Sequence, residues 1–381
     1  MAQGQQLGLG LIGGGGFGTY CLEAFRRLGC VRLVAAARAA KPDARALCDR
    51  LGVRVLDSYE EVIACEDVGV VHVATPPESH YRLALAALRA GKHVLCEKPP
   101  ALCAREAEAL ARAADEAGVF FAPNFVMRFS PIAGIVRDLV RGGALGRVLA
   151  ADVTNCASDA GLPPDHWFWA KDTSGGIFIE HGVHFFDLYA WWLGPGEVLS
   201  AHAERRERGG QEDRVTCTVR HALAGHSGIP VTHYHGFDQV APMDRTEHRL
   251  VCELGDVRVE GWLPQRLTVD AAVDDASLGR LRGCLPDAEA EVLEEYPPGR
   301  RDILGRGEVR HVTKRVRLRY SLPQDKESLY ADAIRALLAD QVAWVRDRGH
   351  RRHVTARQGV EALACAESAA RLAEAGARGG A

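Results

Sequence analysis

The stretch that most restricts what this chain can fold into is LGLGLIGGGGFGTYCLEAF, residues 7–25. A short apolar run ends in the pattern Gly13-x-Gly15-x-x-Gly18, and helical spacing begins at Phe17. In a strand–turn–helix unit, glycines at these positions let the backbone approach a pyrophosphate at the helix N-terminus. The pattern alone is weak in a chain with 40 glycines, so its context in the sequence decides its meaning.

The first 125 residues supply that context, because short apolar runs alternate with segments of helical spacing. Uninterrupted apolar runs are typical of strands that are covered on both faces of a parallel sheet. Strands alternating with helices of about 10–15 residues indicate βαβ units. Residues 1–125 are therefore predicted to form a doubly wound Rossmann domain that binds NAD or NADP. The expected strands are 6–12, 31–37, 68–74 and 93–97, and the expected helices are 17–28, 44–51, 79–90 and 104–117.

The end of the second expected strand bears on the choice between NAD and NADP. NAD-binding domains usually place an acid there, which binds the ribose 2′-hydroxyl. This chain has Arg38 at that point and Lys41 nearby, and a guanidinium can pair with a 2′-phosphate. The sequence thus favours NADP or the use of both cofactors. An equally good interpretation is that Arg38 stacks on the adenine and selects neither.

From about residue 126 the pattern changes to a period of two. Runs such as RVTCTVRHALA and KRVRLRY place alternate side chains on opposite faces of a strand. This favours a large, mostly antiparallel open sheet with one solvated or partner-covered face. Residues 126–381 are predicted to be a C-terminal α/β domain for substrate binding and oligomerisation, with helices near 329–346 and 356–374. The charged segment 287–307 is expected to be a long loop.

A second signature, residues 73–101, reads VATPPESHYRLALAALRAGKHVLCEKPPA. Its Thr75-Pro76 and Glu97-Lys98-Pro99 follow two strands at the edge where doubly wound sheets bind ligands. A lysine there can point into the cofactor crevice, although most lysines are solvated.

Together these signatures resemble the glucose–fructose oxidoreductase / inositol dehydrogenase (Gfo/Idh/MocA) family. The resemblance continues through NFVMRFSP (124–131), GGIFIEHGVHFFD (175–187) and VTARQGVEALACAESA (354–369), so it covers most of the chain. It implies a Rossmann domain followed by an α/β domain with an open sheet. It also implies dimers or tetramers built through that sheet, and a pyridine-nucleotide-dependent activity on sugars, cyclitols or related polyols.

The resemblance also carries individual site residues onto this sequence. The family lysine of Glu-Lys-Pro falls on Lys98, and the family motif Asp-x-Gly-x-His-x-x-Asp falls on Glu180, Gly182, His184 and Asp187. The expected cofactor-binding residues are Gly13, Gly15, Gly16, Phe17, Gly18, Arg38, Thr75, Pro76, His80, Glu97 and Lys98.

Three positions depart from the family pattern: Glu180 replaces Asp, and prolines occupy positions 77 and 100. Glu180 keeps acid/base chemistry available but shifts its geometry by one methylene. Pro77 and Pro100 affect the contacts expected on the nicotinamide side.

Helical spacing gives residues 175–187 a chemical interpretation. If a helix begins near Ile177, then Glu180, His184 and Asp187 share one face. Histidine suits the removal of a hydroxyl proton from a secondary alcohol, and a lysine ammonium stabilises the developing alkoxide. We therefore expect His184 to be the acid/base, Lys98 its electrophilic partner, and Glu180 the group that tunes or orients them.

The other polar residues of this stretch are expected to have supporting roles. His181 lies about 100° from the shared face and is interpreted as structural. Asp187 can orient a backbone group or an arginine. A metal site is not expected, because the order Glu-His-x-x-His differs from the His-Glu-x-x-His of zinc peptidases.

The expected substrate-binding residues lie mainly upstream of that stretch. Trp167 and Trp169 can pack on sugar C–H surfaces, and Lys171 can pair with an anionic substituent. Alternatively, the two tryptophans anchor a loop to the core. Arg128 matches a family arginine near the site, and His184 also belongs to this set. His233 and His235 share one face of a strand and face either substrate or simply the sheet surface.

Composition excludes several partners. The formal net charge of −3 implies no bulk attraction to nucleic acid or membrane. No apolar run is long enough for a transmembrane helix, and the first residues do not resemble a signal peptide. Eleven cysteines without Cys-x-x-Cys spacing suggest reduced thiols and a cytoplasmic protein.

Three functions are compatible with these features. The leading one is an NAD(P)-dependent oxidoreductase of a secondary hydroxyl on a sugar or cyclitol. A second is a glycoside hydrolase or lyase that transiently oxidises the sugar and then eliminates. A third is a non-catalytic cofactor sensor, which the presence of both Lys98 and His184 disfavours.

Overall fold

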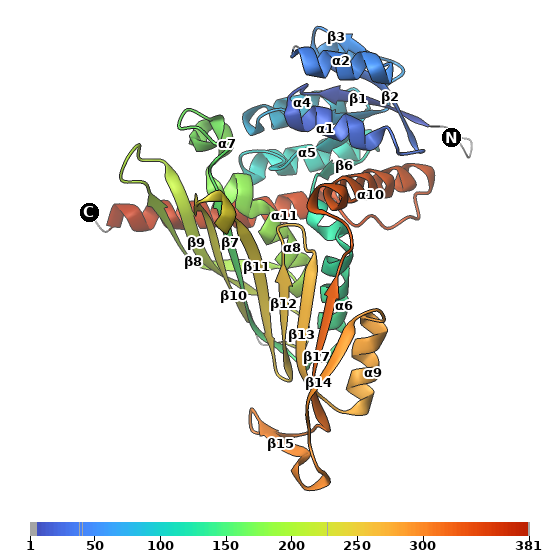
Figure 1. Ribbon diagram of the computed structural model, residues 1–381. Helices are drawn as coiled ribbons and strands as arrows, with labels where there is room; N and C mark the ends of the chain where they lie inside the picture. Colours follow the sequence, from blue (N-terminus) through green and yellow to red (C-terminus); the bar gives the residue numbers. More distant parts are fainter. Residues whose placement is uncertain (1–5, 38, 40, 227, 380–381) are drawn as a thin grey trace. The chain divides into compact units, whose positions relative to one another are not determined.

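The computed structural model describes residues 6–37, 39, 41–226 and 228–379 (Figure 1). The chain divides into two compact units, and each is assembled from segments that are separate in the sequence. The first unit consists of Met1–Phe129, Pro164–Asp187 and Glu327–Glu367, and the second of Ser130–Pro163, Leu188–Lys326 and Ser368–Ala381.

The first unit contains a six-stranded parallel sheet with the order β3-β2-β1-β4-β5-β6. This is the strand order of a doubly wound Rossmann sheet, so the predicted fold of this region is confirmed. Its strands are β1 (Leu7–Ile12), β2 (Val31–Ala37), β3 (Arg54–Leu56), β4 (Val70–Val73), β5 (His93–Cys96) and β6 (Phe121–Pro123). Its helices are α1 (Gly16–Phe25), α2 (Pro42–Leu51), α3 (Tyr59–Ala64), α4 (His80–Arg89) and α5 (Ala104–Ala117).

Apolar runs form the inner strands of this sheet because both of its faces are covered. Every residue of β1 and of β4 is buried, as expected for strands with helices on both faces. On one face, Val71 and Val73 of β4 pack with Leu83 and Leu88 of α4. The sheet is therefore a rigid platform for the turns at its carboxyl edge.

The second unit contains a nine-stranded sheet with the order β14-β17-β13-β12-β11-β7-β10-β9-β8. All its neighbouring strands are antiparallel except β7 and β10, so the predicted mostly antiparallel sheet is confirmed. The strands are β7 (Val148–Ser158), β8 (Gly196–Arg205), β9 (Glu212–His221), β10 (Ile229–Gln239), β11 (Arg245–Cys252), β12 (Gly255–Glu260), β13 (Arg266–Val273), β14 (Glu289–Glu295) and β17 (Lys314–Ser321).

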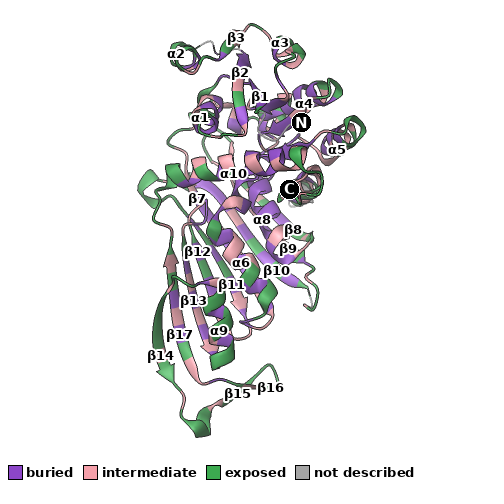
Figure 2. Ribbon diagram, turned by 90° about the vertical axis from the view of Figure 1, so that its right-hand side faces the viewer, coloured by how far each residue is buried: buried purple, intermediate pink, exposed green. Residues whose placement is uncertain are grey.

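One face of this sheet is covered by helices. Buried and more exposed residues alternate along β9, β11 and β13, which is the period-two pattern of the sequence (Figure 2). Helix α6 (Pro131–Gly142) and the later turns of α8 (Val183–Leu193) belong to this unit. The Trp192 indole donates to the carbonyl of Ala133 at 2.9 Å, and the Tyr189 hydroxyl donates to the carbonyl of Asp152 on β7 at 2.9 Å.

The prediction of a long loop over residues 287–307 is wrong. Strand β14 pairs with β17, and β15 (Asp302–Gly305) forms a hairpin with β16 (Glu308–His311). Strand β14 pairs with β17 through its backbone and lacks an apolar pattern, and its Glu291 carboxylate accepts from the Arg319 guanidinium at 3.0 Å. A search for alternating apolar residues therefore does not detect this strand.

The last two helices are present where they were predicted. Helix α10 spans Lys326–Arg346, and α11 spans Ala356–Gly379. Helix α9 (Asp275–Cys284) lies between β13 and β14 in the chain. Within the described ranges, none of the helices has the length and apolar character needed to cross a bilayer.

Candidate active site

The glycine turn between β1 and α1 has the geometry of a phosphate cradle. Gly13 has a φ of +113°, and a Cβ there would lie 2.4 Å from the carbonyl oxygen of Ala74. A Cβ on Gly18 would lie 2.0 Å from the carbonyl oxygen of Gly13. In contrast, a Cβ on Gly15 or Gly16 would meet open space. The first pair therefore shapes the turn, and the second leaves room for a ligand at the N-terminus of α1.

That N-terminus fits a dinucleotide pyrophosphate. Among the described residues, no side chain caps the first turn of α1, and none of its first residues is acidic. Its backbone N–H groups and the helix dipole thus favour an anion. Phe17, in the same turn, is 37% exposed. Arg38, the predicted selector between NAD and NADP, lies outside the described residues.

The two predicted turns at the carboxyl edge are tied together by His80. Its Nε2 lies 2.7 Å from the carbonyl oxygen of Thr75, and its Nδ1 lies 2.7 Å from that of Pro99. Thr75 in turn shares a 2.5 Å hydroxyl contact with Ser79. Burial lowers the pKa of His80, so the neutral ring donates to one carbonyl at a time. His80 thereby fixes the spacing between the Thr75-Pro76 turn and the Lys98 turn.

Lys98 and Glu180, which are 82 residues apart, form an ion pair. The Lys98 ammonium donates to the Glu180 carboxylate and, at 3.0 Å, to the backbone carbonyl of Glu180. The two side chains are only 18% and 9% exposed, so salt screens this pair weakly. The extra methylene of Glu180 is thus used to reach the lysine.

The backbone at Glu180 differs from the predicted plain helix. Residues Phe178–Gly182 form a π-helical turn, and α8 continues from it. Such a turn widens the helix by one residue and is frequent at functional sites. Glu180 and His184 still belong to one continuous helical segment, but the regular α-helical spacing expected from Ile177 onward is wrong in this first turn.

His184 is 3% exposed and is held neutral by its surroundings. Burial lowers its pKa well below the ordinary value, and the positive charge of Lys98 lowers it further. Its ring meets Phe125 edge-on, with 6.3 Å between centroids. The imidazole is therefore neutral, and the Lys98 charge acts on it.

Asp187 and Arg128 form a buried clamp at the next turn of α8. The guanidinium donates through Nε and Nη2 to the two carboxylate oxygens, at 2.7 and 2.6 Å. A third donor, Nη1, reaches the carbonyl of His353 at 3.0 Å. The expectation that Asp187 orients an arginine is confirmed. A substrate contact for Arg128 stays a prediction, because the contacts described here hold the helix.

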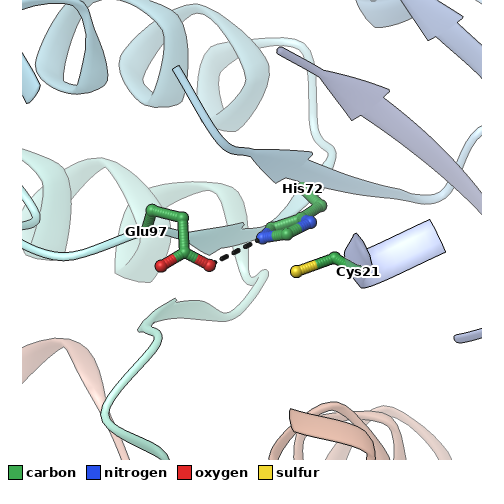
Figure 3. A group of neighbouring side chains, drawn as sticks. All are labelled: Cys21, His72 and Glu97. Atoms are coloured by element: carbon green, nitrogen blue, oxygen red, sulfur yellow. Dashed lines mark hydrogen bonds and ion pairs between the residues drawn. The ribbon is translucent and has the colours of Figure 1, made fainter. Parts of the chain in front are cut away.

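Glu97 belongs to a buried polar cluster beside Lys98. Cys21 of α1, His72 of β4 and Glu97 after β5 point toward one another, with ligand atoms within 4.8 Å (Figure 3). His72 Nε2 lies 3.1 Å from Oε1 of Glu97, and the Asn124 amide donates to the same oxygen at 2.6 Å.

This cluster is the one group of described residues whose spacing could hold a metal ion. Burial, with the Glu97 charge, raises the pKa of the Cys21 thiol well above its ordinary value. A protonated thiol is a poor metal ligand. Two side chains already bind Oε1 of Glu97, so we interpret the cluster as a buried polar network.

The tryptophan segment folds as two short helical turns rather than as a loop. Trp167 and Trp169 flank Phe168, which is the buried anchor at 7% exposure. The following helix, α7 (Lys171–Ser174), packs against the turn that contains Pro77. Both tryptophans are half-buried, and their role toward a substrate, like that of Lys171, stays a prediction.

His233 and His235 lie in the second unit and are fully buried on the covered face of β10. The His233 ring is 5.2 Å from that of Tyr189. This supports the interpretation in which these histidines face the sheet surface and not a substrate. His181 is likewise buried, with its ring 5.3 Å from Phe185, as expected for a structural residue.

One residue near this site was not predicted from the sequence. Tyr330 of α10 contacts Phe17 of the glycine turn, with 6.0 Å between ring centroids. It lies within an ordinary amphipathic helix pattern more than 300 residues from Phe17, so neither spacing nor composition sets it apart.

Comparison with known proteins places this geometry in a family. A model of the oxidoreductase family with an NAD-binding Rossmann fold matches residues 7–125, and the GFO/IDH/MocA C-terminal domain matches residues 135–257.

Two curated relatives illustrate the sequence similarity. The chain is 36% identical over 169 residues to 1,5-anhydro-D-fructose reductase of Ensifer adhaerens, covering 43% of this chain and 50% of the relative. It is 32% identical over 191 residues to inositol 2-dehydrogenase of Rhizobium meliloti, covering 50% and 56%. The chain thus spans about half the length of these curated relatives.

A solved structure extends the similarity of fold to nearly the whole chain. Levoglucosan dehydrogenase in complex with NADH and levoglucosan superposes with a TM-score of 0.74 at 19% identity, covering 97% of this chain and 98% of that one. The matches to the two family models show that the chain belongs to the Gfo/Idh/MocA oxidoreductase family, in agreement with the glycine turn and with Lys98, Glu180 and His184.

Proposed function

We propose that the protein is an NAD(P)-dependent oxidoreductase that interconverts a secondary alcohol and a ketone on a sugar or cyclitol. The observation that carries this proposal is the buried Lys98–Glu180 pair together with a neutral His184 on which the Lys98 charge acts. An alcohol oxidation needs a base for the hydroxyl proton and a positive charge for the oxygen, and this arrangement offers both.

The residues divide the reaction between them. His184 accepts the hydroxyl proton during oxidation and returns it during reduction. Lys98 donates a hydrogen bond to the substrate oxygen and stabilises its negative charge. Glu180 holds the lysine at one position, so the ammonium is aligned before the substrate arrives. Gly15 and Gly16 would hold a dinucleotide through its pyrophosphate, and its nicotinamide would supply the hydride acceptor for the alcohol carbon.

The substrate class rests on the relatives. One is named for a reductase of an anhydro sugar, another for an inositol dehydrogenase, and the solved neighbour for levoglucosan. Half-buried Trp167 and Trp169 are compatible with a carbohydrate, since aromatic faces pack on its C–H surfaces. For the cofactor, Arg38 favours NADP or dual use, because its charge can pair with the 2′-phosphate.

A panel of sugars, cyclitols and glycosides, each offered with NAD and with NADP, tests the proposal. Nicotinamide absorbance and carbohydrate products are followed together. Stoichiometric NAD(P)H formation from an alcohol substrate is expected. Cleavage of a glycoside without net cofactor reduction would instead support the redox-assisted hydrolase, and no reaction together with no cofactor binding would refute both. Arg38→Asp should weaken NADP binding more than NAD binding.

A further inference from the structure

Tyr330 is held beside the glycine turn by two aromatic side chains of α1. Its ring lies 6.0 Å from that of Phe17, at an interplanar angle of 66°, and 6.0 Å from that of Tyr20. The Tyr20 hydroxyl donates to the carbonyl of Glu327 at 3.0 Å, which ties the first turn of α10 to α1. All four residues belong to the first unit.

Charged groups near the proposed reaction site also act on the Tyr330 side chain. The charges of Glu97 and Glu180 act on its hydroxyl, along with Cys21 and Tyr20. Burial is the largest cause, and all these groups raise the pKa of Tyr330 well above its ordinary value. Its O–H therefore stays protonated and remains a donor. Glu97 precedes Lys98 in the chain, and Glu180 is the ion-pair partner of Lys98.

Tyr330 thus contacts one end of the expected cofactor site, and charges from the other end act on its hydroxyl. Phe17 marks the end that would hold the pyrophosphate, and the Lys98–Glu180 pair marks the end where hydride would be exchanged. A dinucleotide bound by its pyrophosphate at the glycine turn would extend its nicotinamide half from that turn toward Lys98. A rigid aromatic side chain there supplies a large contact area at low cost in side-chain entropy.

We propose that Tyr330 is a cofactor-positioning residue, whose ring closes the crevice over the nicotinamide half of the dinucleotide. This inference rests on the proposed function, because it requires a nicotinamide cofactor. It assigns to α10, at the other end of the chain from the Rossmann strands, a part in cofactor binding. Orientation of the ring matters because a small misplacement of the reacting carbon lowers the rate of hydride transfer.

The test compares variants that keep or remove the ring. Tyr330→Phe keeps it, whereas Tyr330→Leu and Tyr330→Met each replace it with an aliphatic side chain, branched in Leu and unbranched and adaptable in Met. Tyr81→Leu on α4 is the matched control, since it removes a partly buried tyrosine from the same unit far along the chain from these contacts. NADH and NADPH are titrated into each full-length protein, and the intensity and wavelength of nicotinamide fluorescence are recorded.

We expect Tyr330→Leu and Tyr330→Met to raise the Kd for the reduced cofactor by about tenfold, and Tyr330→Phe to stay within about threefold. Nicotinamide emission in the first two variants should move toward that of free cofactor. The melting temperature without cofactor serves to confirm folding, and the cofactor-induced rise in melting temperature should be smaller in Tyr330→Met than in wild type.

Different results would overturn the proposed function and the role of Tyr330. If wild type binds neither NADH nor NADPH, the proposed function fails. If wild type binds one of them and folded Tyr330→Met binds it with unchanged affinity and emission, only the role of Tyr330 fails. A loss of affinity in Tyr81→Leu equal to that in Tyr330→Leu would also overturn the role, since the effect would then be a general loss of packing.

Discussion

Acidification should destabilise the second unit, because its sheet is packed around neutral histidines. His233 and His235 on β10 and His248 on β11 are at most 1% exposed, and Tyr189 of α8 packs over His233 and His248 with centroid distances of 5.2 and 5.8 Å. His221 on β9 lies against the same tyrosine at 6.3 Å. The experiment compares the protein at pH 7.5 and at pH 5.5.

The sign follows from where the protons bind. Burial lowers the pKa of His235 and of His248 from the ordinary 6.5 to about 3, and His248 adds to the effect on His235. Below pH 6.5 the unfolded chain therefore binds protons that the folded sheet excludes. Stability is fully present above this pH and is lost as the pH falls from about 6.5 toward about 3.

The magnitude can be worked from these two residues alone. At pH 5.5, one unit below the unfolded pKa, each histidine lowers the folding equilibrium constant by about tenfold. Together they remove about 3 kcal/mol, a large fraction of the usual stability of about 5–15 kcal/mol for a domain. Burial also lowers the pKa of His233 and His221, which adds to the loss in the same direction.

Amide hydrogen exchange reports the effect on this unit separately from the Rossmann unit. After correction for the intrinsic pH dependence of exchange, peptides from β10 and β11 should exchange at least about a hundredfold faster at pH 5.5 than at pH 7.5. The double variant His235→Leu/His248→Leu should lose the share of this pH sensitivity that these two histidines supply, about a hundredfold, and keep the share that comes from His233 and His221. His202→Gln on β8, which removes an exposed histidine from the same sheet, is the matched control. Equal protection at both pH values in wild type, or undiminished pH sensitivity in the double variant, would refute the reasoning.

Three further predictions follow from the first unit. Arg128→Met should lower the free energy of unfolding by about 3–5 kcal/mol in urea titrations, because it leaves the buried Asp187 carboxylate without its cation; a loss below about 1 kcal/mol would contradict the clamp. Gly18→Ala should weaken NADH binding by more than tenfold in fluorescence titrations, since its Cβ would lie 2.0 Å from a backbone oxygen. Gly29→Ala, where a Cβ meets open space, should bind normally. Treatment with EDTA should leave activity unchanged, and elemental analysis should find less than about 0.1 equivalent of zinc or iron per chain. If activity were lost with a metal and restored by it, the Cys21–His72–Glu97 cluster or another site would bind an ion.

The part of the site that sequence could predict is the part encoded by local motifs. The glycine turn follows from Gly13 and Gly18, because only glycine tolerates those backbone contacts. Lys98 was placed at a strand end by the apolar run before it. These features depend on neighbouring residues, which a single sequence displays directly.

The remaining features depend on pairings across long separations. The partner of Lys98 is 82 residues away, and that of Arg128 is 59 residues away, so local spacing could not identify either pair. Strand β14 escaped prediction because its sequence is charged and lacks alternating apolar residues, although its backbone pairs with β17. The π-helical turn at Glu180 was missed because a period of 3.6 assumes a regular helix. Tyr330 was missed because its partner Phe17 lies near the other end of the chain.

The central claim is that Lys98 and His184 perform the proton and charge chemistry of an alcohol oxidation. It is tested most directly by single-turnover hydride transfer in His184→Asn and Lys98→Met, using the best substrate from the panel and cofactor at saturating concentration. His181→Asn is the matched control, since it changes the neighbouring buried imidazole of the same helical segment.

We expect His184→Asn and Lys98→Met each to slow hydride transfer by about 10²–10⁴-fold, with cofactor affinity kept within about threefold in His184→Asn. Hydride transfer in His181→Asn should stay within about threefold of wild type. Transfer at the wild-type rate in either His184→Asn or Lys98→Met would contradict the assignment of these two residues.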